Sequence, residues 1–293
     1  PGPGTLIFSG SMIVVRTRGE LAEALEVARG GGATISLVPT MGFLHEGHLS
    51  LMDLAKADSD LVAASIFVNP LQFGQGEDLD RYPRDTKRDL GLLEERGVDL
   101  VFQPAAQEMY PAGEPLVTVD PGQMGGLLCG AYRPGHFRGV LTVVARLFGL
   151  FRPSVAVFGQ KDYQQVALVE RMVRDLELGV RVLRGPVIRE EDGLAMSSRN
   201  VFLSQQERDD AIGLFRGLMT VQDAFAGGET STAALQECFM ERAAEHSGLA
   251  IQYAEVVDPD SLLPVDPAAP GAVVAAAGFC GSTRLIDNHT LAT

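Results

Sequence analysis

The stretch "TISLVPTMGFLHEGHLSLM", residues 34–52, holds in one place the features that predict the fold of this chain. Its first part, "TISLVP" at 34–39, is a short apolar run typical of a buried strand. An amphipathic helical pattern follows, and Gly42, His45 and His48 lie between the two elements. The order of strand, glycine-containing turn and helix predicts the start of an alternating α/β fold.

The same alternation continues along the first two thirds of the chain. The sequence predicts further strands at 61–68, 98–104, 154–159 and 180–188, and helices at 84–97, 139–151 and 164–178. Asn69-Pro70 and Gly97 supply the stop signals after a strand and a helix. Strands that alternate with helices pair in parallel through right-handed crossovers. We therefore predict a Rossmann-like, doubly wound parallel sheet.

The pattern changes near residue 190. Two helical stretches, 204–226 and 231–246, precede three runs typical of antiparallel strands, at 251–259, 271–279 and 283–291. Pro186 and Asp192-Gly193 mark the change. These features predict a Rossmann-like domain over residues 1–188 and a smaller α+β domain over 189–293.

Composition excludes several classes of protein. The 293 residues carry a formal net charge of −14, which disfavours non-specific binding to nucleic acid or to an anionic membrane. The 3 cysteines are scattered and in no metal-binding spacing, as expected of reduced thiols in a cytoplasmic protein. No apolar run reaches the length of a membrane span. Residues 1–11 lack the pattern of a signal peptide, and we expect them to form a flexible extension before Met12.

The turn that holds His45 and His48 is the first candidate site. The first amides of a helix have no partner within the helix and the helix dipole is positive at this end, so phosphate binds there. Two imidazoles three residues apart can donate hydrogen bonds to phosphate oxygens. Zinc binding is the weaker interpretation, because helical zinc ligands usually stand four apart and need a third. Two solvated loop histidines are the plainer alternative.

Two more stretches point to anion binding. "FGQKDYQQV" at 158–166 follows a strand, so Lys161 is expected at the same carboxyl edge of the sheet. "EEDGLAMSSRN" at 190–200 places two hydroxyls before Arg199, whose guanidinium can bind two oxygens at once. A surface lysine and a serine-rich, helix-capping turn are the alternatives for these two stretches.

Polar residues in three other places complete the candidate set. Gln72, in "NPLQF", follows a strand end and can face a small polar substrate. Asp89 can hold Mg²⁺ directly or through water, although a solvated helix position beside an arginine is the plainer interpretation. "YRPGHFRGV" at 132–140 is either an anion-contacting loop or the start of an apolar helix.

The combination resembles the pantothenate synthetase family of pantoate–β-alanine ligases. The matching stretches are "VPTMGFLHEGH", "FVNPLQF", "YPRD", "YRPGHFRGVLTVV", "AVFGQKDYQQ" and "GLAMSSRN", and they occur in the family's order between about 35 and 204. The resemblance implies kinship with nucleotidylyltransferases and class I aminoacyl-tRNA synthetases. It also implies an enzyme of pantothenate and coenzyme A biosynthesis that forms a homodimer. The C-terminal domain is implied to act as a lid.

The implied reaction uses ATP, Mg²⁺, pantoate and β-alanine in two steps through pantoyl adenylate, and releases pyrophosphate and AMP. The resemblance implies that ATP is bound by Met41, Gly42, Phe43, Leu44, His45, Glu46, Gly47, His48, Gly159, Gln160, Lys161, Asp162, Ile188, Met196, Ser197, Ser198 and Arg199. It further implies catalysis by His45, His48, Lys161 and Arg199, substrate contacts from Gln72, Gln165 and Met41, and a magnesium-associated acid at Asp89. Some relatives carry a second acid where this chain has Arg88.

Two other functions remain open at this stage. A nucleotidylyltransferase that stops at a stable nucleotide product would show no amine-dependent release of AMP. A nucleotide sensor would bind ATP without turnover. Gln72 and Gln165 favour the ligase, because a hydroxy acid needs neutral hydrogen-bonding partners.

Overall fold

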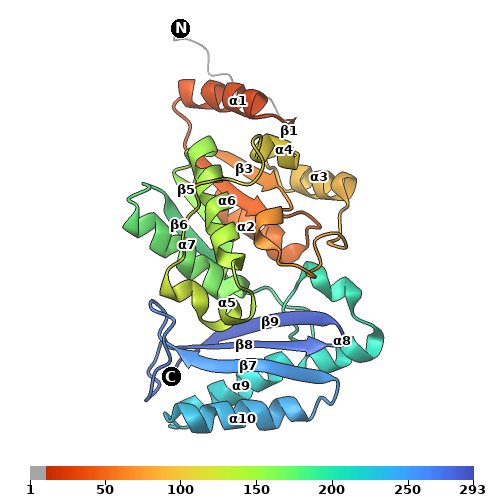
Figure 1. Ribbon diagram of the computed structural model, residues 1–293, viewed down its shortest axis with the longest axis vertical. Helices are drawn as coiled ribbons and strands as arrows, with labels where there is room; N and C mark the ends of the chain where they lie inside the picture. Colours follow the sequence, from red (N-terminus) through yellow and green to blue (C-terminus); the bar gives the residue numbers. More distant parts are fainter. Residues whose placement is uncertain (1–10) are drawn as a thin grey trace. The chain divides into compact units, whose positions relative to one another are not determined.

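Six parallel strands form the larger sheet of the protein. The computed structural model describes residues 11–293 (Figure 1), and the strand order is β1-β4-β3-β2-β5-β6. The strands are β1 Ile13–Val15, β2 Ile35–Thr40, β3 Leu61–Ile66, β4 Leu100–Phe102, β5 Val155–Gly159 and β6 Arg181–Gly185. The chain extends the sheet from β2 through β3 and β4 on one side, and through β5 and β6 on the other. The order therefore reverses between β2 and β5, which confirms the predicted doubly wound sheet.

Helices cover both faces of this sheet. They are α1 Arg18–Gly30, α2 Glu46–Lys56, α3 Thr86–Glu95, α6 His136–Phe151 and α7 Tyr163–Asp175. On one face, Met52 of α2 and Leu93 of α3 share a core with Val101 of β4. Successive strand residues point to opposite faces, so the neighbouring Phe102 meets α6 instead, with its ring 5.9 Å from that of Phe151.

The observed elements follow the predicted ones closely, with a few differences. The sequence prediction did not include β1 or α1, although Thr17 and Glu20 form a capping box at the start of α1. The predicted helix at 204–226 consists of two helices, α8 Gln205–Ala211 and α9 Gly213–Ala226, which meet at Ile212. The short helices α4 Ala106–Met109 and α5 Leu128–Tyr132 lie in the long connection before α6.

The chain packs into two units, and neither is one continuous segment. Among the described residues, the first unit consists of 11–121, 134–159 and 168–185, and contains the parallel sheet. The second unit consists of 122–133, 160–167 and 186–293. Its long segment begins at Pro186, and the residues directly after β5 also belong to it.

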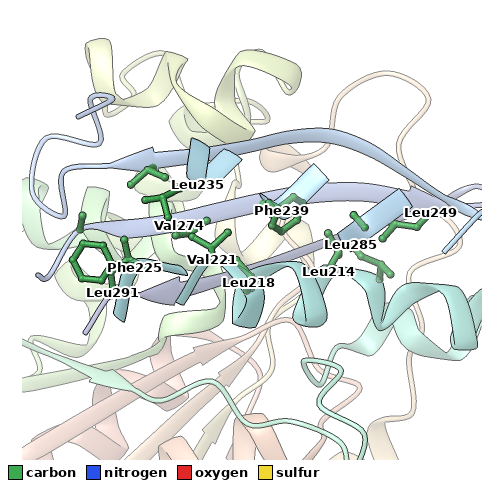
Figure 2. Close-up of a cluster of buried hydrophobic side chains, with 14 of the residues drawn as sticks. Leu214, Leu218, Val221, Phe225, Leu235, Phe239, Leu249, Val274, Leu285 and Leu291 are labelled. Carbon is green, nitrogen blue, oxygen red and sulfur yellow. The ribbon is translucent and has the colours of Figure 1, made fainter. Parts of the chain in front are cut away.

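The second unit is built on a three-stranded antiparallel sheet. Strands β7 Leu249–Val257, β8 Val273–Cys280 and β9 Thr283–Thr290 pair in sequence order, and α9 and α10 (Thr232–Ala244) cover one face. Figure 2 shows Leu218 and Val221 of α9 in one cluster with Phe239 of α10 and Val274 of β8. This arrangement confirms the predicted small α+β region.

In the part of the chain from 11 to 293, no helix combines the length and apolar character that a membrane crossing requires. The predicted extension over residues 1–11 lies, apart from Ser11, outside the described residues.

Candidate functional site

The turn after β2 adopts a backbone conformation that only certain residues tolerate. Gly42 has φ +82° and Phe43 has φ +50°, so two successive residues are left-handed. A Cβ on Gly42 would lie 3.0 Å from both Asp89 Oδ2 and Ile66 Cγ2. Thr40 stabilises the turn, because its hydroxyl donates to Ser65 O (2.8 Å) and accepts the Gly42 N–H (3.2 Å). Glycine at 42 is therefore required by the turn itself.

Asp89 holds this turn through both carboxylate oxygens. The Phe43 N–H donates to Oδ2 (2.7 Å) and the Leu44 N–H donates to Oδ1 (2.8 Å). The neighbouring Arg88 donates to Leu44 O (2.8 Å) and lies with its guanidinium 5.6 Å from the Phe43 ring centroid. Hydrogen bonds to a charged group contribute about 1.5–3 kcal/mol each, which offsets a left-handed strain of about 1–3 kcal/mol at Phe43.

This geometry bears on the predicted magnesium role of Asp89. The side chain is 1% exposed, so the alternative of a solvated helix position is wrong. Both oxygens already accept backbone N–H groups. Within residues 11–293, no group of three or more His, Cys, Asp or Glu side chains is arranged to hold a metal ion. A Mg²⁺ near Asp89 would therefore need other ligands, such as water or phosphate oxygens.

The two histidines stand at the start of α2. His45 is the N-cap residue, with extended backbone (φ −138°), and its N–H donates to Nδ1 of His48 (3.3 Å). The ring centroids are 4.1 Å apart. Because Nδ1 of His48 accepts a hydrogen bond, the neutral ring carries its hydrogen on Nε2, which is therefore a donor. The side chain of Glu46 instead forms an ion pair with Arg96 at the surface (2.5 Å).

The helix N-terminus coincides with the reversal of strand order. β2 leads into α2, and β5, its neighbour on the other side, ends at Gly159. Ligands of open α/β sheets bind at the carboxyl edge beside such a reversal. A Cβ at position 159 would make only an ordinary contact with Leu51 Cδ1 (3.8 Å). Packing within the described residues therefore does not require glycine there.

A buried hydrogen-bond network orients Asn69. Its Oδ1 accepts the Tyr110 hydroxyl (2.8 Å) and the Leu71 N–H (3.3 Å), and its Nδ2 donates to Gly139 O (3.1 Å). A backbone N–H can only donate and a carbonyl can only accept, so the amide has one orientation. Burial raises the pKa of Tyr110 to about 12, which keeps its hydroxyl protonated as a donor near neutral pH.

The orientation of Asn69 also fixes the orientation of Gln72, the predicted substrate contact. Asn69 Nδ2 also donates to Gln72 Oε1 (3.0 Å), so Gln72 presents its Nε2 as a donor, 3.2 Å from Met41 Sδ. Its own carbonyl lies 2.7 Å from His136 Nδ1, on the first turn of α6. Residues 136–140 of the 132–140 stretch thus form the start of α6, and His136 supports Gln72.

A cavity of about 250 Å³ adjoins this group of residues in the first unit. Met41, Phe43 and Phe67 supply apolar lining, and Arg84, Thr86 and Gln103 supply polar groups. The Arg84 guanidinium donates to Tyr82 O (3.0 Å) and Leu79 O (3.1 Å) and is therefore fixed in place.

The other predicted site residues belong to the second unit. Gln160, Lys161 and Asp162 form a short 3-10 helix, η3, and Gln165 follows on α7. Residues 188–196 form a hairpin, in which the Met196 N–H donates to Ile188 O (2.9 Å). Ser197 accepts the Arg199 N–H (3.3 Å) and caps the 3-10 helix η4 (Ser198–Phe202), and Ser198 is 8% exposed.

Within each unit, the structure brings together residues that are distant in sequence. In the first unit these are Met41–His48, Gln72, Asp89 and Gly159. Sequence analysis missed Asn69, Tyr110 and Gly139, although Asn69 stood out as the residue before Pro70. Tyr110 and Gly139 carried no sequence signal, because their role depends on contacts across 41 and 70 residues from Asn69.

The fold and site define a doubly wound α/β protein in which a helix N-terminus that carries two histidines lies at the point of strand reversal. The model of the pantoate-β-alanine ligase family matches residues 13–290, and the chain belongs to this family of enzymes.

Similar proteins agree with this assignment. The pantothenate synthetase of Thermoanaerobacter sp. (strain X514) is 49% identical over 94% of this chain and 98% of its own. The crystal structure of pantothenate synthetase from Thermus thermophilus has 47% identity and a TM-score of 0.90, over 95% of this chain and 99% of that one. The pantoate-β-alanine ligase of Francisella tularensis, complexed with beta-gamma ATP and β-alanine, has 30% identity and a TM-score of 0.78, over 96% and 98%.

Replacing Asp89 by Asn is expected to destabilise the histidine turn. The carboxamide keeps one oxygen for Phe43 or Leu44 and turns an NH₂ group toward the other N–H. We expect the free energy of unfolding, measured by urea titration, to fall by about 2–3 kcal/mol. Asp85→Asn is the control, because Asp85 caps α3 by accepting the Arg88 N–H (3.1 Å) and Asn caps equally well. Equal stability of the two variants would contradict the role given to Asp89.

Replacing Gly139 by Ala is expected to displace Gln72. The new Cβ would lie 2.2 Å from Leu71 O and 2.7 Å from Gln72 N, so the backbone must move. A shift near 1 Å at a positioning residue lowers activity by up to about 10²-fold. Gly149→Ala is the control on the same helix, with no atom within 4 Å of its Cβ. Steady-state ligase kinetics compare the two, and equal rates would rule out this contact as a determinant of Gln72's position.

Proposed function

We propose that this enzyme condenses (R)-pantoate with β-alanine to pantothenate through a pantoyl-adenylate intermediate. The observation that carries the proposal is the histidine pair at the N-terminus of α2, beside the reversal of strand order. Membership of the ligase family supports the overall reaction. The Francisella tularensis relative, complexed with beta-gamma ATP and β-alanine, supports ATP and β-alanine as substrates.

The proposed reaction has two balanced steps. A pantoate carboxylate oxygen attacks the α-phosphorus of ATP, and the bond from that phosphorus to the pyrophosphate oxygen breaks. The amine of β-alanine then attacks the acyl carbon, the acyl–oxygen bond breaks, AMP leaves and the nitrogen loses a proton. Adenylation is needed because an oxide is a poor leaving group, whereas AMP is a good one.

In the first unit, the proposed nucleotide contacts are donors that face developing negative charge. One donor is the Nε2–H group of His48, which carries the ring hydrogen because Nδ1 accepts a hydrogen bond. His45 and the backbone N–H groups of Glu46 and Gly47 add further donors at the positive end of α2. Because Gly159 has no side chain, a nucleotide can approach its backbone closely. Packing against the surrounding protein does not itself require glycine at this position.

In the second unit, we assign the nucleotide contacts to the two segments predicted from sequence. Lys161 and Arg199 supply positive charge for the phosphates, and Ser198 a hydroxyl. Ile188 would use its N–H toward adenine, because its carbonyl already accepts the Met196 N–H. Ser197 holds the local turn through its hydroxyl. We also propose that this unit acts as a closing lid.

We propose that pantoate is contacted by Met41 and Gln72 of the first unit and, as the family resemblance implies, by Gln165 of the second unit. The support is the orientation of Gln72, whose Nε2 donates and therefore matches a carboxylate or hydroxyl oxygen. We further propose that Mg²⁺ accompanies ATP, held mainly by phosphate oxygens and neutralising their charge. Any contribution of Asp89 to this metal would be indirect, since both of its oxygens accept N–H groups of the turn.

We propose a cytoplasmic location, in keeping with the free cysteines, and a homodimer, as the family resemblance implies. Leu116 and Val117, 102% and 86% exposed, supply apolar surface for a partner copy. Sedimentation equilibrium measures the assembly, and a monomer at micromolar concentration would contradict it.

The deciding experiment is isotope exchange between pyrophosphate and ATP. Exchange is expected with pantoate present and β-alanine absent, because the first step is reversible and needs only the acid. AMP release is expected only when β-alanine is added. Exchange without pantoate would overturn the proposal. Pantoate-dependent exchange without any amine-dependent AMP release would favour a nucleotidylyltransferase with a stable product.

Replacing Lys161 by Ala is expected to slow adenylation by at least about 30-fold, equivalent to about 2 kcal/mol of transition-state stabilisation. The exchange rate measures this step directly. Lys87→Ala is the matched control, since Lys87 is an exposed lysine on α3 outside the predicted site. An unchanged exchange rate in the Lys161 variant would remove this residue from the mechanism.

A further inference from the structure

Two adjacent residues of β9 bind both predicted nucleotide segments of the second unit. Asp287 and Asn288 are each 3% exposed, and neither was assigned a role by sequence analysis. Asp287 bonds to Arg189, which directly follows the predicted adenine contact Ile188. Asn288 bonds to the backbone of Gln160 and Lys161. All of these residues lie within the same unit.

Asp287 and Arg189 form a bidentate ion pair. Arg189 Nη1 donates to Oδ2 (2.6 Å) and Nη2 to Oδ1 (3.0 Å), and Nη1 also donates to Gly193 O (3.0 Å). The guanidinium lies 4.6 Å from the Phe215 ring centroid. Oδ1 additionally accepts the Asn288 N–H (2.8 Å). The pair therefore fixes the 188–196 hairpin on β9 in a single geometry.

Asn288 holds the turn after β5. Its Nδ2 donates to Gln160 O and to Lys161 O, at 2.9 Å each. Its Oδ1 is buried, and no partner for it is found among residues 11–293. The reverse orientation of the amide would place Oδ1 against two carbonyl oxygens, so Nδ2 must face them. Replacing Asn288 by Ala therefore removes these two donated hydrogen bonds.

We propose that Asp287 and Asn288 are positioning residues for the nucleotide, which lock the Lys161 turn and the Ile188 hairpin into one arrangement. The proposal rests on the proposed nucleotide contacts of Lys161 and Ile188. The need for such a lock follows from η3, which has only three residues and little intrinsic stability. A fixed backbone at Lys161 reduces the ordering that its long side chain must undergo when ATP binds.

The role predicts a selective loss of nucleotide affinity. Without Nδ2, the Lys161 turn samples more conformations, and ATP must order it on binding. Two neutral hydrogen bonds of ordinary strength correspond to about a 10-fold weakening or more. The KM for pantoate is expected to rise less than the KM for ATP, because Gln72 and Met41 lie in the first unit, where Asn69 orients Gln72. Of the proposed pantoate contacts, only Gln165 follows the Lys161 turn.

The test measures binding of a non-hydrolysable ATP analogue by titration calorimetry, and the KM values for ATP and pantoate, in full-length variants. Asn288→Ala is expected to weaken analogue binding about 10-fold, and Asn288→Asp at least as much, because a carboxylate would face two carbonyl oxygens. Thr290→Val is the control on the same strand, since the Thr290 hydroxyl bonds to the Gln160 side chain (3.3 Å) and not to the backbone of the turn. It is expected to bind as wild type does.

Each other outcome counts against the proposal. Unchanged analogue binding in Asn288→Ala, or an equal rise of the KM for pantoate, would overturn it. Failure of both Asn288 variants to fold, judged by circular dichroism, would assign the residue to stability alone. Binding of the ATP analogue is measured without any reaction of pantoate. A wild-type protein that binds ATP but makes no pantothenate would therefore refute the proposed reaction and leave this test in force.

Discussion

One buried carboxylate sets the geometry at the carboxyl edge of the larger sheet. Asp89 accepts the N–H groups of Phe43 and Leu44, and so holds two successive left-handed residues between β2 and α2. The direction in which α2 leaves the sheet, and with it the placement of His45 and His48, depends on this contact. Arg88 reinforces it by donating to Leu44 O. Arg88 therefore has a structural partner of its own in this turn.

A second constraint passes from backbone to side chain around Gln72. The α6 helix approaches so closely at Gly139 that no side chain fits between it and the backbone of Leu71. The Gly139 carbonyl then dictates the orientation of Asn69, which dictates that of Gln72. Both constraints follow the same physical pattern, in which backbone groups of fixed polarity determine which atom a functional side chain presents.

Most of the fold and part of the site were predictable, for identifiable reasons. Strands such as 34–39 carry short apolar runs, and the change of pattern near 190 is local in sequence. The histidine turn was predictable from the sequence because its strand, glycine and helix are contiguous. The burial of Asp89 was not, because a helix residue reveals its face only when its neighbours are known. The grouping of 160–162 with the second unit likewise depends on contacts with β9, more than 120 residues away.

The sequence by itself determined the alternation of strands and helices, the turn at 40–48 between a strand and a helix, and the family resemblance. These features depend on local spacing and on residue type. Only the tertiary structure decided that Asp89 serves a turn and that Gln72 donates through Nε2. It alone also revealed the link from Asp287 and Asn288 to two distant segments. The reason is that a hydrogen bond has a direction and a partner, and neither is encoded at a single position of the chain.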